Sequence, residues 1–179
     1  MTKLIEKFLL GAMLIVLVFN QAFASDQNDV KNTVQKVFEQ LKSHDYNGLY
    51  EVLPGSARSR MSRDRFVSAL QRAQDMYELD RIDIGAIKVS GNLAVVDTVL
   101  YGRVVKPVQT EGKIVAQQYL VREDGQWRVA TGDQATVRKF LDNNPGFAKG
   151  FKIQPPHVFI KREGNWVQLN RPATQPKRT

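Results

Sequence analysis

The amino-acid sequence predicts an α+β fold: N-terminal helices packed on a curved, cone-shaped antiparallel sheet, with an extra C-terminal helix and hairpin. Three observations predict it. Apolar residues recur at helical spacing in residues 28–73, and β-rich segments separated by turns follow in residues 76–130. The third is Asp124-Gly125 between two β-rich runs, which is typical of a tight hairpin turn. Helices followed by consecutive antiparallel strands favour helices on one face of a sheet.

The helical part contains three amphipathic segments. Asp29–Lys42 is the first, with Asp29 placed to cap it, and Tyr46–Leu53 is a shorter second helix that ends at Pro54-Gly55. Ser62 can cap the third helix, which has Phe66 on its inner face. The apolar stripe of the first helix consists of Val30, Val34, Val37, Phe38 and Leu41. One stripe per helix requires a flat apolar surface to pack against.

Four β-rich segments supply that surface. They are residues 76–89, 93–104 and 112–122, and the strand Gln126–Ala130. In residues 93–104 two rows of side chains alternate between the faces of the sheet. The row with Ala94, Val96, Leu100 and Val104 is the more uniformly apolar. We therefore expect that row to face the core and the row containing Asp97 to face outward.

The C-terminal part continues the domain. A helix is predicted at 133–142 and is broken by Asn143-Asn144-Pro145-Gly146, and a last hairpin turns at Gly164-Asn165. We expect one cone-like domain over residues 25–142 and a β extension, residues 143–170, packed on the same domain. Residues 171–179 are polar, basic and rich in proline, which predicts a disordered tail.

The first 24 residues have the pattern of a signal peptide. Lys3 and Lys7 precede the apolar run Phe8–Phe19, and Ala22-Phe23-Ala24 has small residues where signal peptidase requires them. The run has 12 residues, whereas a bilayer-spanning helix needs about 20. We therefore predict cleavage after Ala24 and a periplasmic or secreted protein. An uncleaved N-terminal anchor is the alternative.

Composition restricts the chemistry and the partners. The absence of cysteine from the 179 residues excludes disulfides and thiolate metal sites. Because the chain has only two histidines, we also expect no metal or cofactor site. Residues 25–134 contain 15 basic and 15 acidic side chains, whereas residues 135–179 contain nine basic and two acidic ones. An exported protein rarely meets nucleic acid, so this basic segment indicates an acidic protein or an anionic membrane surface as partner. A merely solvated face is the alternative.

Several short sequence segments, taken in their order along the chain, resemble the nuclear-transport-factor-2-like (NTF2-like) superfamily. They are Asp29–Lys42, Tyr46–Leu53 with its Leu-Pro exit, the helix start Met61–Phe66, and the strands Gly91–Val96 and Gly125–Val129. The resemblance implies a pocket between helices and concave sheet, and a homodimer formed through the sheet's outer face. It does not decide activity, because the superfamily includes isomerases, dehydratases and non-enzymatic accessory domains. Residues 133–170 depart from its usual ending.

Asp97 and Tyr101 are the candidate catalytic residues. A carboxylate on an apolar wall would have a raised pKa, which suits a general base or acid. Tyr101 lies on the same strand face as Asp97. The resemblance implies that such a tyrosine could hold a developing oxyanion. In the alternative interpretation this row is the outer face and Asp97 pairs with a basic side chain on a neighbouring strand.

Four arginines near the start of the third helix form a candidate anion site: Arg58, Arg60, Arg63 and Arg65. Arginines oppose the positive end of the helix dipole, so a bound phosphate or carboxylate would resolve the conflict. Acidic side chains such as Asp64, Asp75 or Asp80, or plain solvation, would resolve it equally well.

Five aromatic residues are candidates for the wall of a pocket that takes a small apolar ligand: Phe38, Tyr50, Phe66, Tyr119 and Trp127. The alternative is that they form an ordinary core. The sequence thus favours an exported, non-enzymatic binding or accessory module. The competing hypotheses are an isomerase- or dehydratase-like enzyme using Asp97 and Tyr101, and a docking protein using the basic C-terminal segment.

Overall fold

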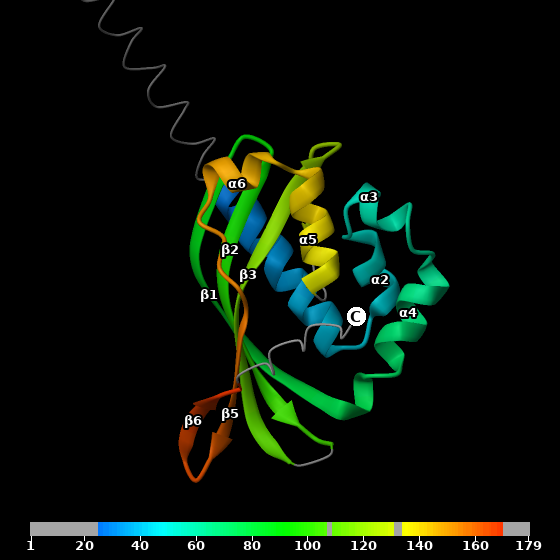
Figure 1. Ribbon diagram of the computed structural model, residues 1–179. Helices are drawn as coiled ribbons and strands as arrows, with labels where there is room; N and C mark the ends of the chain where they lie inside the picture. The colour runs from blue at the N-terminus through cyan, green and yellow to red at the C-terminus, as the bar shows by residue number, and fades with distance from the viewer. Residues whose placement is uncertain (1–24, 107–108, 131–133, 170–179) are drawn as a thin grey trace, which may run out of the picture.

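The computed structural model describes residues 25–106, 109–130 and 134–169, so the predicted signal peptide and the predicted tail 171–179 lie outside the described residues. Its helical part begins with the helix 25–42, followed by α2 (Tyr46–Glu51), α3 (Gly55–Arg58), α4 (Arg63–Gln71) and the short 3₁₀ helix η1 (Gln74–Met76). Figure 1 shows these helices together on one side of the sheet. In the described part of the chain, no helix is both long and apolar enough to cross a bilayer.

All strand pairs in the sheet are antiparallel, and its order is β1-β2-β3-β5-β6, with β4 also paired to β3. The strands are β1 (Tyr77–Ser90), β2 (Leu93–Val104), β3 (Thr110–Glu123), β4 (Gln126–Ala130), β5 (His157–Arg162) and β6 (Asn165–Gln168). The predicted α+β class, with helices on a curved antiparallel sheet and an added C-terminal helix and hairpin, is confirmed.

Strand β3 has two partners on one edge. Its residues 119–123 pair with β4, and its residues 112–115 pair with β5. Between them, residues 116–118 have no strand partner on that edge among the described residues. Two strands joined to the same edge therefore leave a three-residue gap in the middle of the sheet.

The first core lies between the helix 25–42 and the sheet, on what we call the inner face. Ala94 and Val96 of β2 are fully buried there against Val30 and Val34, which confirms the predicted core row for this half of the strand. The predicted start of the first helix is wrong. The helix is continuous from residue 25, so Asp29 is an interior residue whose carbonyl accepts a hydrogen bond from the Thr33 hydroxyl at 2.7 Å.

A second core lies on the outer face of the sheet. Helices α5 (Gln134–Asn143) and α6 (Gly146–Gly150) cover Val95 and Tyr119 there, in front of the sheet in Figure 1. The Phe147 ring lies edge-on to Tyr119 at 5.5 Å and is 0% exposed. The sequence predicted that this row faced outward. It is instead buried in this half of the sheet, because the added helices supply a second apolar layer.

Positive backbone φ angles identify the hairpin turns. Asp124 and Gly125 have φ of 51° and 75°, as the type I′ turn between β3 and β4 requires. Glu163 and Gly164 have φ of 49° and 82°. The last turn is therefore Glu163-Gly164, one residue earlier than the predicted Gly164-Asn165.

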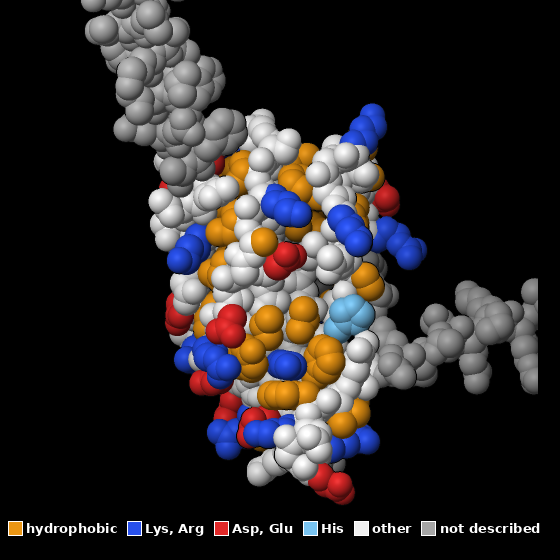
Figure 2. Space-filling model, turned by 90° about the vertical axis from the view of Figure 1, so that its left-hand side faces the viewer, with side chains coloured by type: hydrophobic (Ala, Val, Ile, Leu, Met, Phe, Trp, Pro, Cys, Tyr) orange, Lys and Arg blue, Asp and Glu red, His pale blue; other side chains and the backbone are white. Residues whose placement is uncertain are grey.

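At the other end of the sheet, no helix among the described residues covers the outer face. We call this end the distal sheet: residues 77–83, 99–104 and 110–115 with the β5–β6 hairpin. Figure 2 shows its outer face, where hydrophobic side chains surround a basic one. On this face the Lys113 ammonium lies 5.2 Å from the Phe159 ring and 4.6 Å from the Trp166 ring. Large apolar side chains of the distal sheet are partly exposed on both faces: Val115 (36%) on the outer face, and Ile114 (41%) and Leu169 (40%) on the inner face.

The second core should contribute strongly to stability. We expect Phe147→Ala to lower the free energy of unfolding by about 3–5 kcal/mol, because it leaves a cavity among closely packed rings. Met76→Ala, at a side chain 49% exposed, is the control and should change it by less than about 0.5 kcal/mol. Urea unfolding followed by circular dichroism measures both. Equal small effects would contradict the packing of α6 on the sheet.

Candidate functional site

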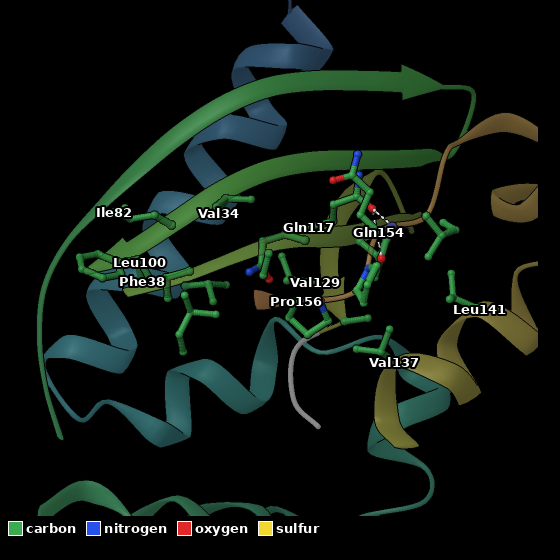
Figure 3. Close-up of a pocket in the computed structure, with 18 of the residues that line it drawn as sticks. Val34, Phe38, Ile82, Leu100, Gln117, Val129, Val137, Leu141, Gln154 and Pro156 are labelled. Atoms are coloured by element: carbon green, nitrogen blue, oxygen red, sulfur yellow. Dashed lines mark hydrogen bonds between the residues drawn. The ribbon is translucent and has the colours of Figure 1, made fainter. Parts of the chain in front are cut away.

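A cavity of about 660 Å³ opens at the gap in the edge of β3. Its floor is the inner face of the sheet, and the helix 25–42 forms one wall with Val34 and Phe38. Figure 3 shows Ile82 and Leu100 at one end of the cavity, and Val137 and Leu141 of α5 at the other. The segment 153–156, which leads into β5, passes beside the gap and completes the wall. Apolar side chains from both ends of the domain thus meet around one cavity.

Gln117, in the unpaired stretch of β3, holds the cavity wall together. Its amide nitrogen donates to the backbone carbonyl of Lys152 at 3.2 Å and to the Asp97 carboxylate at 3.1 Å. Its amide oxygen accepts from the backbone N–H of Gln154 at 2.9 Å and from the Tyr119 hydroxyl at 3.3 Å. The contacts with Lys152 and Gln154 fasten the segment before β5 to the part of the sheet edge that no described strand covers, and the contacts with Asp97 and Tyr119 hold the Gln117 amide in place on the sheet.

The predicted catalytic pair lies away from the helix-covered interior. Asp97 is exposed on the outer face and contacts Gln117, the partner that the structure gives it instead of a basic side chain. Tyr101 lies further along the same face, where the Arg81 guanidinium stacks at 3.7 Å from its ring. Burial, with a smaller contribution from the Asp97 charge, raises the pKa of Tyr119. The structure thus places Tyr119, not Tyr101, in the network of Asp97.

Of the five predicted pocket aromatics, two line the cavity: Phe38 and Tyr119. Trp127 is buried in the first core, and Phe66 packs against that core. The Tyr50 hydroxyl donates to the carbonyls of Arg58 and Met61 at 3.1 and 2.8 Å, and so holds the loop before α4. Sequence reasoning missed Gln117, Gln154 and Arg138, which also line the cavity. Only the tertiary pairing of distant segments brings them together.

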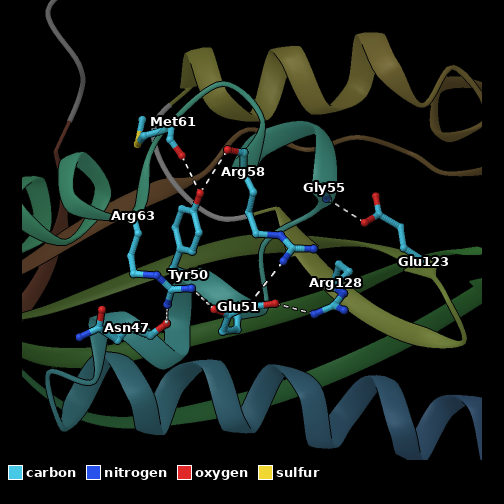
Figure 4. A network of polar contacts seen from close by, with 9 residues as sticks. All are labelled: Asn47, Tyr50, Glu51, Gly55, Arg58, Met61, Arg63, Glu123 and Arg128. Atoms are coloured by element: carbon cyan, nitrogen blue, oxygen red, sulfur yellow. Dashed lines mark hydrogen bonds and ion pairs between the residues drawn. The ribbon is translucent and has the colours of Figure 1, made fainter.

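The arginine cluster is organised by a carboxylate that the sequence did not single out. Figure 4 shows Arg58 and Arg63 directed at the Glu51 side chain, and Arg128 donating to the Glu51 carbonyl. Arg63 also stacks on Tyr50, with its guanidinium 4.9 Å from the ring. Arg60 and Arg65 are exposed. Two of the four arginines are therefore paired within the protein, by Glu51 rather than by Asp64, Asp75 or Asp80.

The hydrogen bond from Arg63 holds the pKa of the Glu51 carboxyl below its usual value of 4.5, against a smaller opposing effect of desolvation and with support from the charges of Arg63, Arg58 and Arg128. No group of three or more histidine or acidic side chains within the described residues could hold a metal ion. The polar side chains that line the cavity are the amides of Gln117, Gln118 and Gln154, the Tyr119 hydroxyl and the Arg138 guanidinium.

No protein-family model matches the sequence, and no curated protein matches it. Solved structures with similar folds include a proposed dehydratase of the NTF2-like family from Streptomyces avermitilis, with a TM-score of 0.45 and 12% identity over 59% of this chain and 91% of that chain. A proposed scytalone dehydratase from Novosphingobium aromaticivorans has a TM-score of 0.42 and 15% identity over 62% and 83%. An LEH-like epoxide hydrolase from M. tuberculosis has a TM-score of 0.39 and 15% identity over 69% and 97%.

These similarities concern the fold alone. The described element order, with amphipathic helices first and a curved antiparallel sheet after them, is that of an NTF2-like α+β cone. The fold and the site together define an α+β protein with helices on a curved antiparallel sheet, an apolar cavity, and C-terminal elements in the wall of that cavity.

The lowered pKa of Glu51 sets a pH dependence for stability. The charged carboxylate stabilises the fold fully above its usual pKa of 4.5, and this contribution is lost as the pH falls through the lower folded-state value. We expect the thermal midpoint of Glu51→Gln to lie below that of the wild type at neutral pH and to approach it on acidification.

Arg63→Met is the matched control. The two substitutions should not be additive, because each removes the same hydrogen bond. A constant difference between wild type and Glu51→Gln at all pH values, measured by thermal unfolding, would contradict the role given to this carboxylate.

Proposed function

We propose that the chain is an exported, non-enzymatic binding module that holds a small apolar ligand in the cavity beside β3. The observation that carries the proposal is the composition of the cavity wall. Its side chains are mostly aliphatic or aromatic, and the strongly polar ones are the three amides of Gln117, Gln118 and Gln154 and the guanidinium of Arg138. Small-molecule sites combine an apolar wall with a few such groups, at volumes of about 300–1,000 Å³.

The same wall gives little support to acid–base catalysis. The described residues that line the cavity include no carboxylate and no imidazole. Asp97 contacts the wall only through Gln117, whose amide is already engaged by backbone groups of Lys152 and Gln154. Among the described residues, a ligand in the cavity therefore meets mainly surfaces that bind and orient it. The Tyr119 hydroxyl also lines the cavity, but its raised pKa keeps it protonated at neutral pH.

Export is supported by the sequence of the first 24 residues, which has the charged, apolar and small-residue parts of a signal peptide in order. Mass analysis of the protein recovered from its producing cells tests this part of the proposal. A mature chain beginning at Ser25 is expected, and a cytoplasmic chain that retains residues 1–24 would contradict export.

Ligand binding can be tested by filling the cavity. Ala116 projects into it from β3, whereas the neighbouring Val115 lies on the outer face. We expect Ala116→Phe to weaken binding of the apolar dye Nile red by about tenfold or more, which corresponds to about 1.4 kcal/mol. Val115→Phe should leave binding unchanged. Equal effects of the two variants, or no binding to the wild type, would overturn the proposed function.

Native mass spectrometry of the protein as isolated is the complementary measurement. A small mass that is lost on denaturation, and that is reduced in Ala116→Phe but retained in Val115→Phe, would identify the natural ligand in the cavity. A retained passenger in both variants would place that molecule elsewhere on the protein.

A further inference from the structure

The cavity continues into a second hollow on the inner face of the distal sheet. This groove has a volume of about 340 Å³, and its walls include Leu79, Val104, Ile160 and Leu169. Four residues line both spaces: Leu41, Leu100, Ile114 and Val158. Because the two spaces share a wall, they form one continuous apolar surface along the inner face of the sheet.

The length of this surface follows from β3. Its inner-face residues, from Gln118 through Ala116 and Ile114 to Gly112, line first the cavity and then the groove. Six residues of strand span about 20 Å. A compact ligand would occupy the cavity and leave the groove open to water, whereas an extended chain would cover both. Such a chain would also cover Ile114 and Leu169, which are 41% and 40% exposed.

The two ends of the surface differ in charge. The two cations beside the groove, Arg103 and Lys113, belong to the outer-face rows of β2 and β3 and are engaged there: Arg103 pairs with Glu78 at 3.0 Å, and Lys113 lies over the rings of Phe159 and Trp166. Arg138 lines the cavity end, is exposed, and has no acidic partner among the described residues. The amides of Gln117 and Gln154 lie at the same end, as Figure 3 shows.

From this arrangement we infer that the ligand is an elongated anionic amphiphile, with its charged head at Arg138 and its alkyl chain running through the cavity into the groove of the distal sheet. This inference rests on the proposed function, because it requires the cavity to be a binding site. The head is a carboxylate or a phosphate, and the chain is long and unbranched. A free fatty acid and the acyl chain of a phospholipid share this chemistry.

A series of alkyl carboxylates tests the chain. We expect affinity to rise from octanoate through dodecanoate to hexadecanoate, by about three- to fourfold for each added CH₂ that is buried. Dodecyltrimethylammonium, which has the opposite charge, should bind more weakly than dodecanoate. Lysophosphatidylglycerol distinguishes the two sources, since tighter binding of this lipid than of hexadecanoate would assign the head to a phosphate. Displacement of Nile red measures each affinity.

Two pairs of variants locate the ends of the ligand. Leu169→Lys places a charge in the groove, and Val115→Lys places one on the outer face at a similarly exposed apolar site. Only Leu169→Lys should lower the affinity for hexadecanoate, and neither should change that for octanoate. Arg138→Gln should weaken binding of every carboxylate by about tenfold, whereas Lys139→Gln, which removes a charge that does not line the cavity, should not. Circular dichroism confirms that each variant is folded.

The outcomes separate this inference from the proposed function. If octanoate and Nile red bind in the cavity but affinity does not rise with chain length, or if Leu169→Lys behaves like Val115→Lys, the amphiphile is excluded and the cavity remains a site for a compact ligand. If Arg138→Gln does not change the affinity for carboxylates, the inference that an anionic head group binds at Arg138 is overturned. If no probe binds the wild type, the proposed function and this inference both fail.

Discussion

The structure depends on one constraint, which is the length of β3. This strand has 14 residues and pairs with β2 along almost its whole length, but its hairpin partner β4 has only five. The remaining edge of β3 presents unpaired backbone groups unless another strand covers it. The C-terminal strand β5 returns to cover four of these residues, and the segment before it is fastened by the Gln117 side chain. The cavity lies where the two covering strands fail to meet.

The same division of β3 gives the two halves of the sheet different surroundings. Beside β4, both faces are covered, by the helix 25–42 on one side and by α5 and α6 on the other. The run Leu93–Val96 is accordingly apolar at four successive positions, as strands buried on both faces require. Beside β5 the strands carry large apolar side chains that stay partly exposed, and the inner-face ones, Ile114 and Leu169, belong to the surface that the proposed ligand would cover.

The sequence was sufficient to predict most elements, because their signals are local. Strand β2 runs from Leu93 to Val104 as predicted, and Ser62 caps α4 by accepting from the Arg65 N–H. The site was harder to predict, because its signals are not local. Gln117 has the pattern of any surface residue in a strand, and its role comes from Lys152, 35 positions away. Likewise, the outer row of β2 becomes a core only because α5 and α6 return to cover it.

The elements that follow β4 complete the wall of the cavity, and this limits what the fold alone can say about function. Val137, Leu141, Pro156 and Val158 all come from this C-terminal part of the chain. Similarity of the cone-shaped fold to that of dehydratases or epoxide hydrolases carries no information about a cavity wall that is built from these C-terminal segments. Asp97, whose carboxylate contacts Gln117 of that wall, is on the outer face, and the Gln117 amide is itself fully engaged. The proposed binding function therefore rests on the residues of this wall, which are mostly apolar, and not on the similarity of the fold.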